Sequence, residues 1–265
     1  MKKIFTTRIL FMGMLVLASL FLLPSLAWTQ DILTFTEAIR KNPNNAVAYY
    51  NRGNIYAFNR DYAKAIEDFT QAIKINLDFP EAYYNRGNAY FEIANYDKAI
   101  DDYDQAIRLN PNFPEMYYNR GNAYTKKNDS NKAIENYSQA IKLNPNYIDA
   151  YNNRGIAYAD RKEYDKAIAD YTQAILFAPD AADAYYNRSL AYVNKNDYDK
   201  AIIDYSHIIR INPNHSVSYY NRGIIYFNNK NYEKAVEDFE SALKIDPNDA
   251  TAKENLEIAK KQLGR

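Results

Sequence analysis

Cysteine is absent from this chain of 265 residues. Its absence excludes disulfide bonds, thiolate metal sites and a lipid attached to a cysteine after a signal segment. The packing of side chains must therefore supply the stability of the fold.

Catalytic side chains and phosphate-binding loops are also scarce. The only histidines are His207 and His215, and the 7 glycines occur singly, without a glycine-rich phosphate loop. Carboxylates are abundant, but they recur at a fixed spacing, which fits solvated helix faces better than one acid–base pair. We expect no enzyme activity, no catalytic residues, no metal site and no cofactor.

The first residues differ from the rest of the chain. Lys2, Lys3 and Arg8 precede an apolar run of 15 residues, and small residues follow up to Ala27. This order predicts a secretory signal over residues 1–27, and hence export to the bacterial periplasm or secretion. The alternative is an uncleaved anchor, although such a run would rise only about 22 Å as a helix, short of a hydrocarbon core of roughly 30 Å. We expect contact with a membrane only in that case.

The charge balance bears on the choice of partner. Basic and acidic residues number 33 each, and loss of the three basic residues before Ala27 leaves 30 against 33, a net charge near −3. Such a chain lacks the basic surface that nucleic-acid phosphates and anionic lipids require. We therefore expect no nucleic-acid partner.

One short motif returns at a fixed interval. The tyrosine that opens the stretch Tyr49–Gly53 recurs at 83, 117, 151, 185 and 219, always 34 residues on. Self-similarity at one period is typical of repeat architectures. We predict six repeats over residues 46–249, namely 46–79, 80–113, 114–147, 148–181, 182–215 and 216–249.

Each repeat contains two segments with helical spacing. In the second repeat Tyr83, Gly87 and Tyr90 lie one turn apart, and Tyr96 begins a second segment with the same spacing. The break carries side chains suited to helix N-caps, and a proline follows the second segment in most repeats. The N-cap candidates are Asp61, Asn95, Asp129, Asp197, Asn231 and the weaker Glu163. Each repeat is therefore predicted to be a helical hairpin.

The pattern resembles the tetratricopeptide repeat, whose signature runs from an aromatic residue through leucine–glycine, tyrosine and alanine to a final proline. The matches in the second repeat are Tyr83, Gly87, Tyr90, Ala99, Tyr103, Ala106 and Pro111. The resemblance covers residues 46–249 and implies an all-α fold, a tetratricopeptide α-solenoid of six helical hairpins. We expect a half-repeat helix over residues 28–45 before the hairpins and a C-terminal cap helix over residues 250–265.

An arginine stands in each repeat where the family usually has leucine. Because a lone guanidinium at a helix interface is costly, we predict that it pairs with an acid or amide sixteen residues later. The arginines are Arg52, Arg86, Arg120, Arg154, Arg188 and Arg222, and the partners are Asp68, Asp102, Asn136, Asp170, Asp204 and Asp238. The alternative is that these arginines bind an acidic ligand.

In this family the first helix of each repeat lines a concave groove, and the resemblance assigns that role to three series of residues. The first series is Tyr50, Tyr84, Tyr118, Tyr186 and Tyr220, with Asn152 in the fourth repeat. The second is Asn51, Asn85, Asn119, Asn153, Asn187 and Asn221. The third is polar and then apolar: Asn54, Asn88, Asn122, Ile156, Leu190 and Ile224.

Each of the first two series has a structural alternative. Tyrosine offers a large rigid contact area with one polar tip, but it could serve only for packing between repeats. The asparagines are similar to the ladder of O-linked N-acetylglucosamine transferase, which holds an extended peptide by its main chain. Equally, their amides could only tie neighbouring helices together.

The expected partner is a protein or an extended peptide. Chaperone-binding members of the family grip a C-terminal carboxylate with lysine and arginine, at positions that carry tyrosine, asparagine and acids in this chain. An acidic rim is also present, at Glu81, Glu115, Asp149 and Asp183. We expect an exported, non-catalytic interaction scaffold that binds an extended protein segment in its concave groove. The alternative is a structural subunit of an envelope multiprotein assembly that uses its convex face or its ends.

Overall fold

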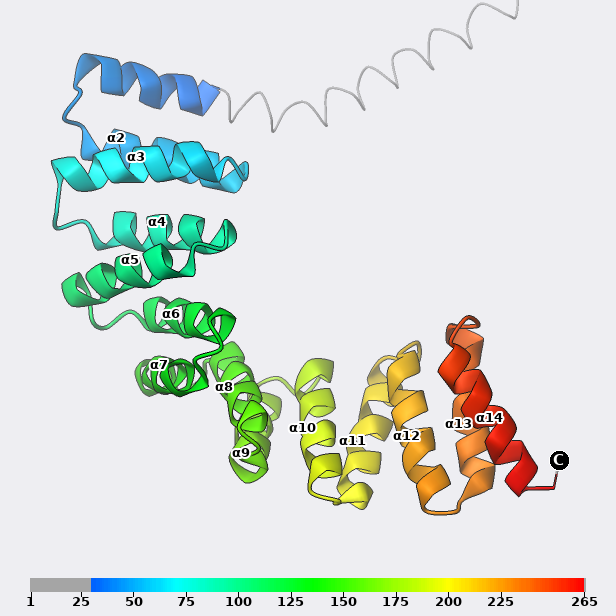
Figure 1. Cartoon of the computed structure of the whole chain (residues 1–265). Helices are drawn as coiled ribbons and strands as arrows, with labels where there is room; N and C mark the ends of the chain where they lie inside the picture. The colour runs from blue at the N-terminus through cyan, green and yellow to red at the C-terminus, as the bar shows by residue number, and fades with distance from the viewer. Residues whose placement is uncertain (1–29, 265) are drawn as a thin grey trace, which may run out of the picture. The chain divides into compact units, whose positions relative to one another are not determined.

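The computed structural model describes residues 30–264, and the predicted signal over residues 1–27 lies outside that range. Every regular element among the described residues is a helix, as predicted. One helix covers residues 30–41, and the helices labelled α2 to α14 in Figure 1 follow it. Their bounds are α2 Ala46–Phe58, α3 Tyr62–Ile75, α4 Pro80–Glu92, α5 Tyr96–Leu109, α6 Pro114–Lys126, α7 Ser130–Leu143, α8 Ile148–Asp160, α9 Tyr164–Phe177, α10 Ala182–Asn194, α11 Tyr198–Ile211, α12 Ser216–Asn228, α13 Tyr232–Ile245 and α14 Ala250–Gln262.

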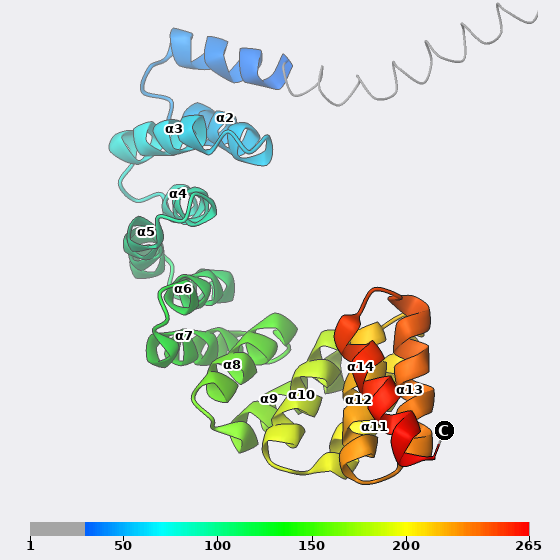
Figure 2. The same ribbon diagram turned by 45° about the vertical axis from the view of Figure 1, so that its right-hand side comes forward.

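The chain forms two compact units, the first ending at Ala123 and the second beginning at Tyr124, inside α6. In the first unit, α2 packs against α3, α3 against α4, and α4 against α5. In the second unit the same alternation runs from α7 to α14, with each helix packed against the next. Figures 1 and 2 show the paired helices side by side within each unit. The predicted helical hairpins are therefore the building blocks of both units.

Each hairpin turns through one residue in the left-handed backbone region. Ala94, for example, has a φ of 59° directly before the N-cap of α5. No glycine fills any of these six positions, which are Arg60, Ala94, Asn128, Lys162, Asn196 and Lys230.

The N-cap that follows the turn begins the second helix of the hairpin. Side chains of Asp61, Asn95, Asp129 and Asn231 accept from the backbone amide three residues on, as predicted. The other two candidates, Asp197 and Glu163, make no such cap bond. Their carboxylates pair with a lysine three residues on in the same helix.

Small residues let the two helices of a hairpin approach closely. A Cβ atom added at Gly87 would lie 2.8 Å from Cε1 of Tyr103, which is 1% exposed in the facing helix. An alanine at the same position of every second helix is fully buried: Ala65, Ala99, Ala133, Ala167, Ala201 and Ala235. The core is consequently a series of small clusters within and between successive hairpins of each unit.

The helices α2 to α14 are 13 or 14 residues long. None of them, within residues 30–264, has the length and apolar character needed to cross a bilayer.

Candidate functional site

The repeated arginine forms a buried, two-pronged ion pair between the helices of its hairpin. Arg86 donates from Nε to Asp102 Oδ2 at 2.8 Å and from Nη2 to Oδ1 at 2.7 Å. Their side chains are 17% and 6% exposed. Burial raises the pKa of the Asp102 carboxyl, and the guanidinium opposes that rise. The predicted pairing sixteen residues apart is confirmed for Arg52, Arg86, Arg154, Arg188 and Arg222.

The third guanidinium nitrogen has a partner that sequence reasoning missed. Arg86 Nη1 donates to Thr70 Oγ1 at 3.0 Å, sixteen residues before the arginine and in the preceding repeat. The corresponding hydroxyls are those of Thr36, Thr70, Ser138, Thr172 and Ser206. In the third repeat the same place holds Asp104, which pairs with Arg120. The sequence contains a pattern that predicts this contact, because a hydroxyl or acid stands sixteen residues before each arginine.

The arginines thus act within the fold. Each guanidinium bonds to the preceding repeat through Nη1, and in five repeats its other two nitrogens hold an aspartate of its own hairpin. Few donors are left for a ligand, so the geometry favours the structural interpretation over binding of an acidic ligand.

The second tyrosine of the motif packs its ring and uses its hydroxyl as an acceptor. Tyr84 lies 6.0 Å from the ring centroid of Tyr103 and 6.2 Å from that of Phe113. Burial raises the pKa of Tyr84, so its phenol is neutral at physiological pH. Similar ring contacts hold Tyr50, Tyr186 and Tyr220, while Tyr118 stands at the same position of α6. The rings of Tyr50, Tyr84, Tyr186 and Tyr220 therefore contribute to packing.

The asparagine series links the first helices of successive repeats. Asn119 Nδ2 donates to Tyr84 Oη at 2.8 Å and to Asn88 Oδ1 at 2.9 Å. Asn85 makes the equivalent bonds to Tyr50 Oη at 3.1 Å and Asn54 Oδ1 at 2.7 Å. In the second unit the same link joins Asn187 to Asn152, Asn221 to Tyr186, and Asn255 to Tyr220. Asn255 was not predicted, although it lies 34 residues after Asn221.

In the first unit these links leave the side-chain oxygens of Asn85 and Asn119 open. The side-chain oxygens of Asn85 and Asn119 accept no hydrogen bond from any residue in the range 30–264, and both side chains are half-buried. Because the nitrogens are anchored, the oxygens are held in fixed directions. The amides therefore tie helices together and also present acceptors.

The predicted groove residues lie on the first helices of the hairpins in each unit, and we name the two sets by their chemistry. The polar face of the first unit is defined by Tyr50, Asn51, Asn54, Tyr84, Asn85, Asn88, Tyr118, Asn119 and Asn122, on α2, α4 and α6. The apolar face of the second unit is defined by Asn153, Ile156, Tyr186, Asn187, Leu190, Tyr220, Asn221 and Ile224, on α8, α10 and α12. Ile156 and Ile224 also pack against core clusters, whereas Leu190 is 36% exposed.

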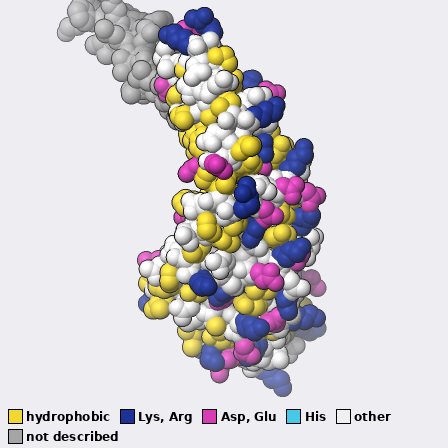
Figure 3. Space-filling model, turned by 90° about the vertical axis from the view of Figure 1, so that its left-hand side faces the viewer, with side chains coloured by type: hydrophobic (Ala, Val, Ile, Leu, Met, Phe, Trp, Pro, Cys, Tyr) yellow, Lys and Arg dark blue, Asp and Glu magenta, His cyan; other side chains and the backbone are white. Residues whose placement is uncertain are grey.

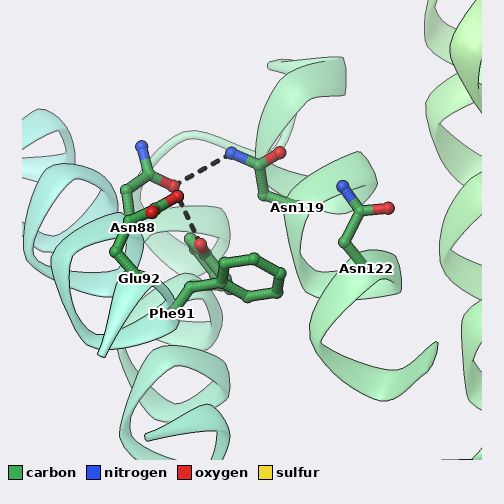
Figure 4. A pocket seen from close by; sticks show the side chains of 6 residues that line it. Asn88, Phe91, Glu92, Asn119 and Asn122 are labelled. Carbon is green, nitrogen blue, oxygen red and sulfur yellow. Dashed lines mark hydrogen bonds between the residues drawn. The ribbon is translucent and has the colours of Figure 1, made fainter. Parts of the chain in front are cut away.

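A pocket of about 340 Å³ opens on the polar face. It is lined by Asn88, Phe91 and Glu92 of α4, Tyr103 of α5, and Asn119 and Asn122 of α6 (Figure 4). Tyr103 donates its hydroxyl to Asn88 Oδ1 at 2.8 Å, and burial raises its pKa, so this phenol is also neutral. We call this site the polar pocket.

We searched the part of the chain that the structure describes for side chains that could bind a metal ion. No group of three or more histidine, aspartate or glutamate side chains there is placed to hold a metal ion.

Comparisons with known proteins agree with this architecture. One family model described as tetratricopeptide repeat matches residues 46–79, 80–113, 148–181 and 216–249, and others match 182–215 and 102–135. A TPR-repeat model matches residues 121–161. No curated protein sequence matches the chain.

Several solved structures share the fold. YrrB, described as a TPR protein with an unusual peptide-binding site, is 27% identical, with a TM-score of 0.62 over 69% of this chain and 95% of YrrB. MamA is 28% identical, with a TM-score of 0.60 over 63% of this chain and 91% of MamA. The C-terminal part of a TPR repeat-containing protein from Cytophaga hutchinsonii is 20% identical, with a TM-score of 0.78 over 89% and 97% of the two chains.

Proposed function

Because the chain belongs to the tetratricopeptide-repeat family, we propose that it is a non-catalytic interaction scaffold that binds an extended segment of another protein. The polar face and the apolar face supply the contacts, in the concave groove that the family resemblance implies. The partner is a protein or peptide, and no cofactor takes part.

The observation that carries this proposal is the set of anchored amides. The side-chain nitrogens of Asn85 and Asn119 donate to residues of the preceding repeat, and their Oδ1 atoms accept no hydrogen bond from residues 30–264. An extended peptide presents main-chain N–H groups that need acceptors, and acceptors fixed in advance cost little entropy on binding. YrrB, with a peptide-binding site and 27% identity, supports the same class of ligand.

Export remains part of the proposal. It rests on the order of charged, apolar and small residues before Ala27. The absence of a nucleic-acid partner is a prediction as well. It is supported by the interspersed positive and negative side chains on the face drawn in Figure 3.

Blocking each face separately tests the proposal. Single cysteines are introduced on a chain that has none, and each is coupled to a bulky maleimide. One replaces Glu81, an exposed residue of the acidic rim on the same helix as Tyr84, and the other replaces Leu190 of the apolar face. Matched controls carry the label on exposed second-helix positions, Glu67 and Ile203. Capture of random peptides by the full chain should fall with the groove labels and persist with the control labels. Loss with the control labels alone would refute groove binding.

The structural-subunit alternative has one observation in its favour. Leu176 and Ile203 lie on second helices, α9 and α11, and are 66% and 65% exposed. Contiguous apolar patches are typical of contact surfaces, and these two side chains would belong to such a patch in the alternative. If charged substitutions at these two positions release an assembly that the groove labels leave intact, the alternative is favoured.

A further inference from the structure

We infer that the polar pocket receives a lysine or arginine side chain of the bound segment. This inference rests on the proposed function and specifies the ligand chemistry at one place on the polar face. It follows from which polar groups around the pocket already have partners and which do not.

Two of the donor groups around the pocket, on Asn119 and Tyr103, are already in use. Asn119 spends both hydrogens of its amide nitrogen on Tyr84 and Asn88, and Tyr103 donates its hydroxyl to Asn88. A ligand group that needs a hydrogen-bond donor, such as a carboxylate, finds little to bind at these residues.

The acceptors are open. Glu92 is exposed at the pocket wall, and the one contact to its Oε2 is a long hydrogen bond of 3.4 Å from Tyr62. Asn119 Oδ1 accepts nothing from residues 30–264. A group that donates hydrogen bonds can therefore satisfy both, and Figure 4 shows the two residues on opposite sides of the pocket.

A second carboxylate near the pocket has an unsatisfied oxygen. Glu115 lies one turn before Asn119 on α6, and its Oε2 is buried without any hydrogen-bond partner among the described residues. Its charge contributes to raising the pKa of Tyr84, whose hydroxyl accepts from Asn119 of the pocket lining. A buried carboxylate oxygen without a donor is costly, and a ligand donor would relieve that cost.

The repeated arginines on the first helices of the first unit are engaged elsewhere. Arg52 and Arg86 are held by Asp68 and Asp102, and Arg120 pairs with Asp104. None of the six residues that line the pocket is basic. The local charge is therefore negative, and a cationic side chain complements it where a neutral or acidic one does not.

The shape and apolar wall also fit a long basic side chain. Phe91 lines the pocket and is half-buried, which offers an apolar surface to the methylene stem of lysine or arginine. The face of its ring attracts a cation as well. The charged end can then meet Glu92, while main-chain groups of the segment reach Asn119.

The test uses a pool of random dodecapeptides with acetylated N-termini and amidated C-termini, so that only side chains carry charge. The pool is captured on the full chain and on three variants: Glu92→Gln, the double variant Glu92→Gln/Glu115→Gln, and Glu67→Gln. Glu67 is an exposed glutamate of α3 outside the pocket and serves as the matched control. Mass spectrometry gives the ratio of lysine plus arginine to glutamine in the captured peptides.

We expect this ratio to exceed that of the input pool by about threefold or more on the unaltered chain and on Glu67→Gln. A single exposed ion pair corresponds to roughly a two- to fivefold effect, so Glu92→Gln should lower the ratio and the double variant should bring it near that of the input. Circular dichroism checks that the variants keep their helices.

The outcomes separate this inference from the proposed function. If peptides are captured and the label at position 81 abolishes capture, but basic residues are not enriched, the inference is wrong and groove binding stands. Enrichment that survives in the double variant also overturns the inference. If no peptide is captured, or if the groove labels have no effect, both fail.

Discussion

Arg120 pairs with Asp104, which precedes it by sixteen residues, whereas the other five arginines pair with an aspartate sixteen residues later. In this repeat an amide, Asn136, takes the place of the later aspartate, and the carboxylate of Asp104 takes the place of the earlier hydroxyl. The third repeat therefore keeps one carboxylate for its arginine, but the carboxylate belongs to the preceding second helix, α5.

Removal of a buried carboxylate should lower the unfolding free energy of the protein strongly. Asp102→Ala leaves Arg86 buried without its two-pronged partner, and breaking such a pair costs about 3 kcal/mol or more. Asp101→Ala, an exposed change next to it, should stay within roughly 0.5 kcal/mol of the unaltered chain. Urea unfolding followed by circular dichroism measures both. Equal unfolding free energies for the two variants would show that the pair does not stabilise the fold.

Removal of the Asp104 carboxylate, which pairs with Arg120, should lower the unfolding free energy by less than removal of the Asp102 carboxylate. Asp104→Ser installs the kind of hydroxyl that the other repeats use, but it removes the acid that pairs with Arg120. Because the Asp104 side chain is 47% exposed, we expect a loss of about 1 kcal/mol or less in the unfolding free energy. Asp101→Ser, on the same helix, is the control. If both variants unfold at the same urea concentration, Asp104 makes no net contribution.

Glycine at a hairpin turn should stabilise the protein. Ala94 has a φ of 59°, a conformation that costs an L-residue with a side chain roughly 1 kcal/mol and glycine very little. Ala94→Gly should therefore raise the melting temperature. Ala63→Gly, an exposed change inside α3, should lower it by the equivalent of about 1 kcal/mol. A drop in melting temperature for both variants would contradict the role assigned to the turn.

The buried tyrosines predict a loss of stability in alkaline solution. Burial raises the pKa of Tyr103 far above the value of about 10 that tyrosine has in an unfolded chain. Above about pH 10 the unfolded chain therefore releases this proton and the folded chain keeps it, so the unfolding free energy falls as the pH rises.

Tyr103→Phe isolates that contribution, and phenylalanine occupies the same position of the first and sixth repeats as Phe69 and Phe239. Between pH 10 and 12 the unfolding free energy of the unaltered chain should fall more steeply than that of the variant, by about 1.4 kcal/mol per pH unit. Parallel slopes for the two proteins would mean that Tyr103 ionises while folded.

The sequence predicts the hairpins and the paired arginines because both depend on spacing alone. A period of 34 residues fixes which positions of successive helices face one another, and Asp102 is the acid that faces Arg86. The hydroxyl partner, such as Thr70, is not predicted because it belongs to the preceding repeat, whereas the predicted pairing joins two residues of the same repeat.

Other features could not be predicted from residue types. An amide can donate or accept, so only the distances between helices decide that Asn119 donates to Tyr84 and Asn88 and leaves its oxygen open. The left-handed turn residue is Ala94, whereas glycine or asparagine is the residue type that predicts this backbone conformation. The polar pocket likewise depends on side-chain directions from three helices, α4, α5 and α6.

Photo-crosslinking from single cysteines tests the central claim, groove binding, most directly. A benzophenone maleimide is placed at position 81 or 190 on the groove, or at position 67 or 203 on second helices, and a peptide selected from the random pool is added. We predict crosslinks from positions 81 and 190, with only background yield from 67 and 203. Crosslinks from 67 or 203 together with none from 81 or 190 would contradict binding in the groove.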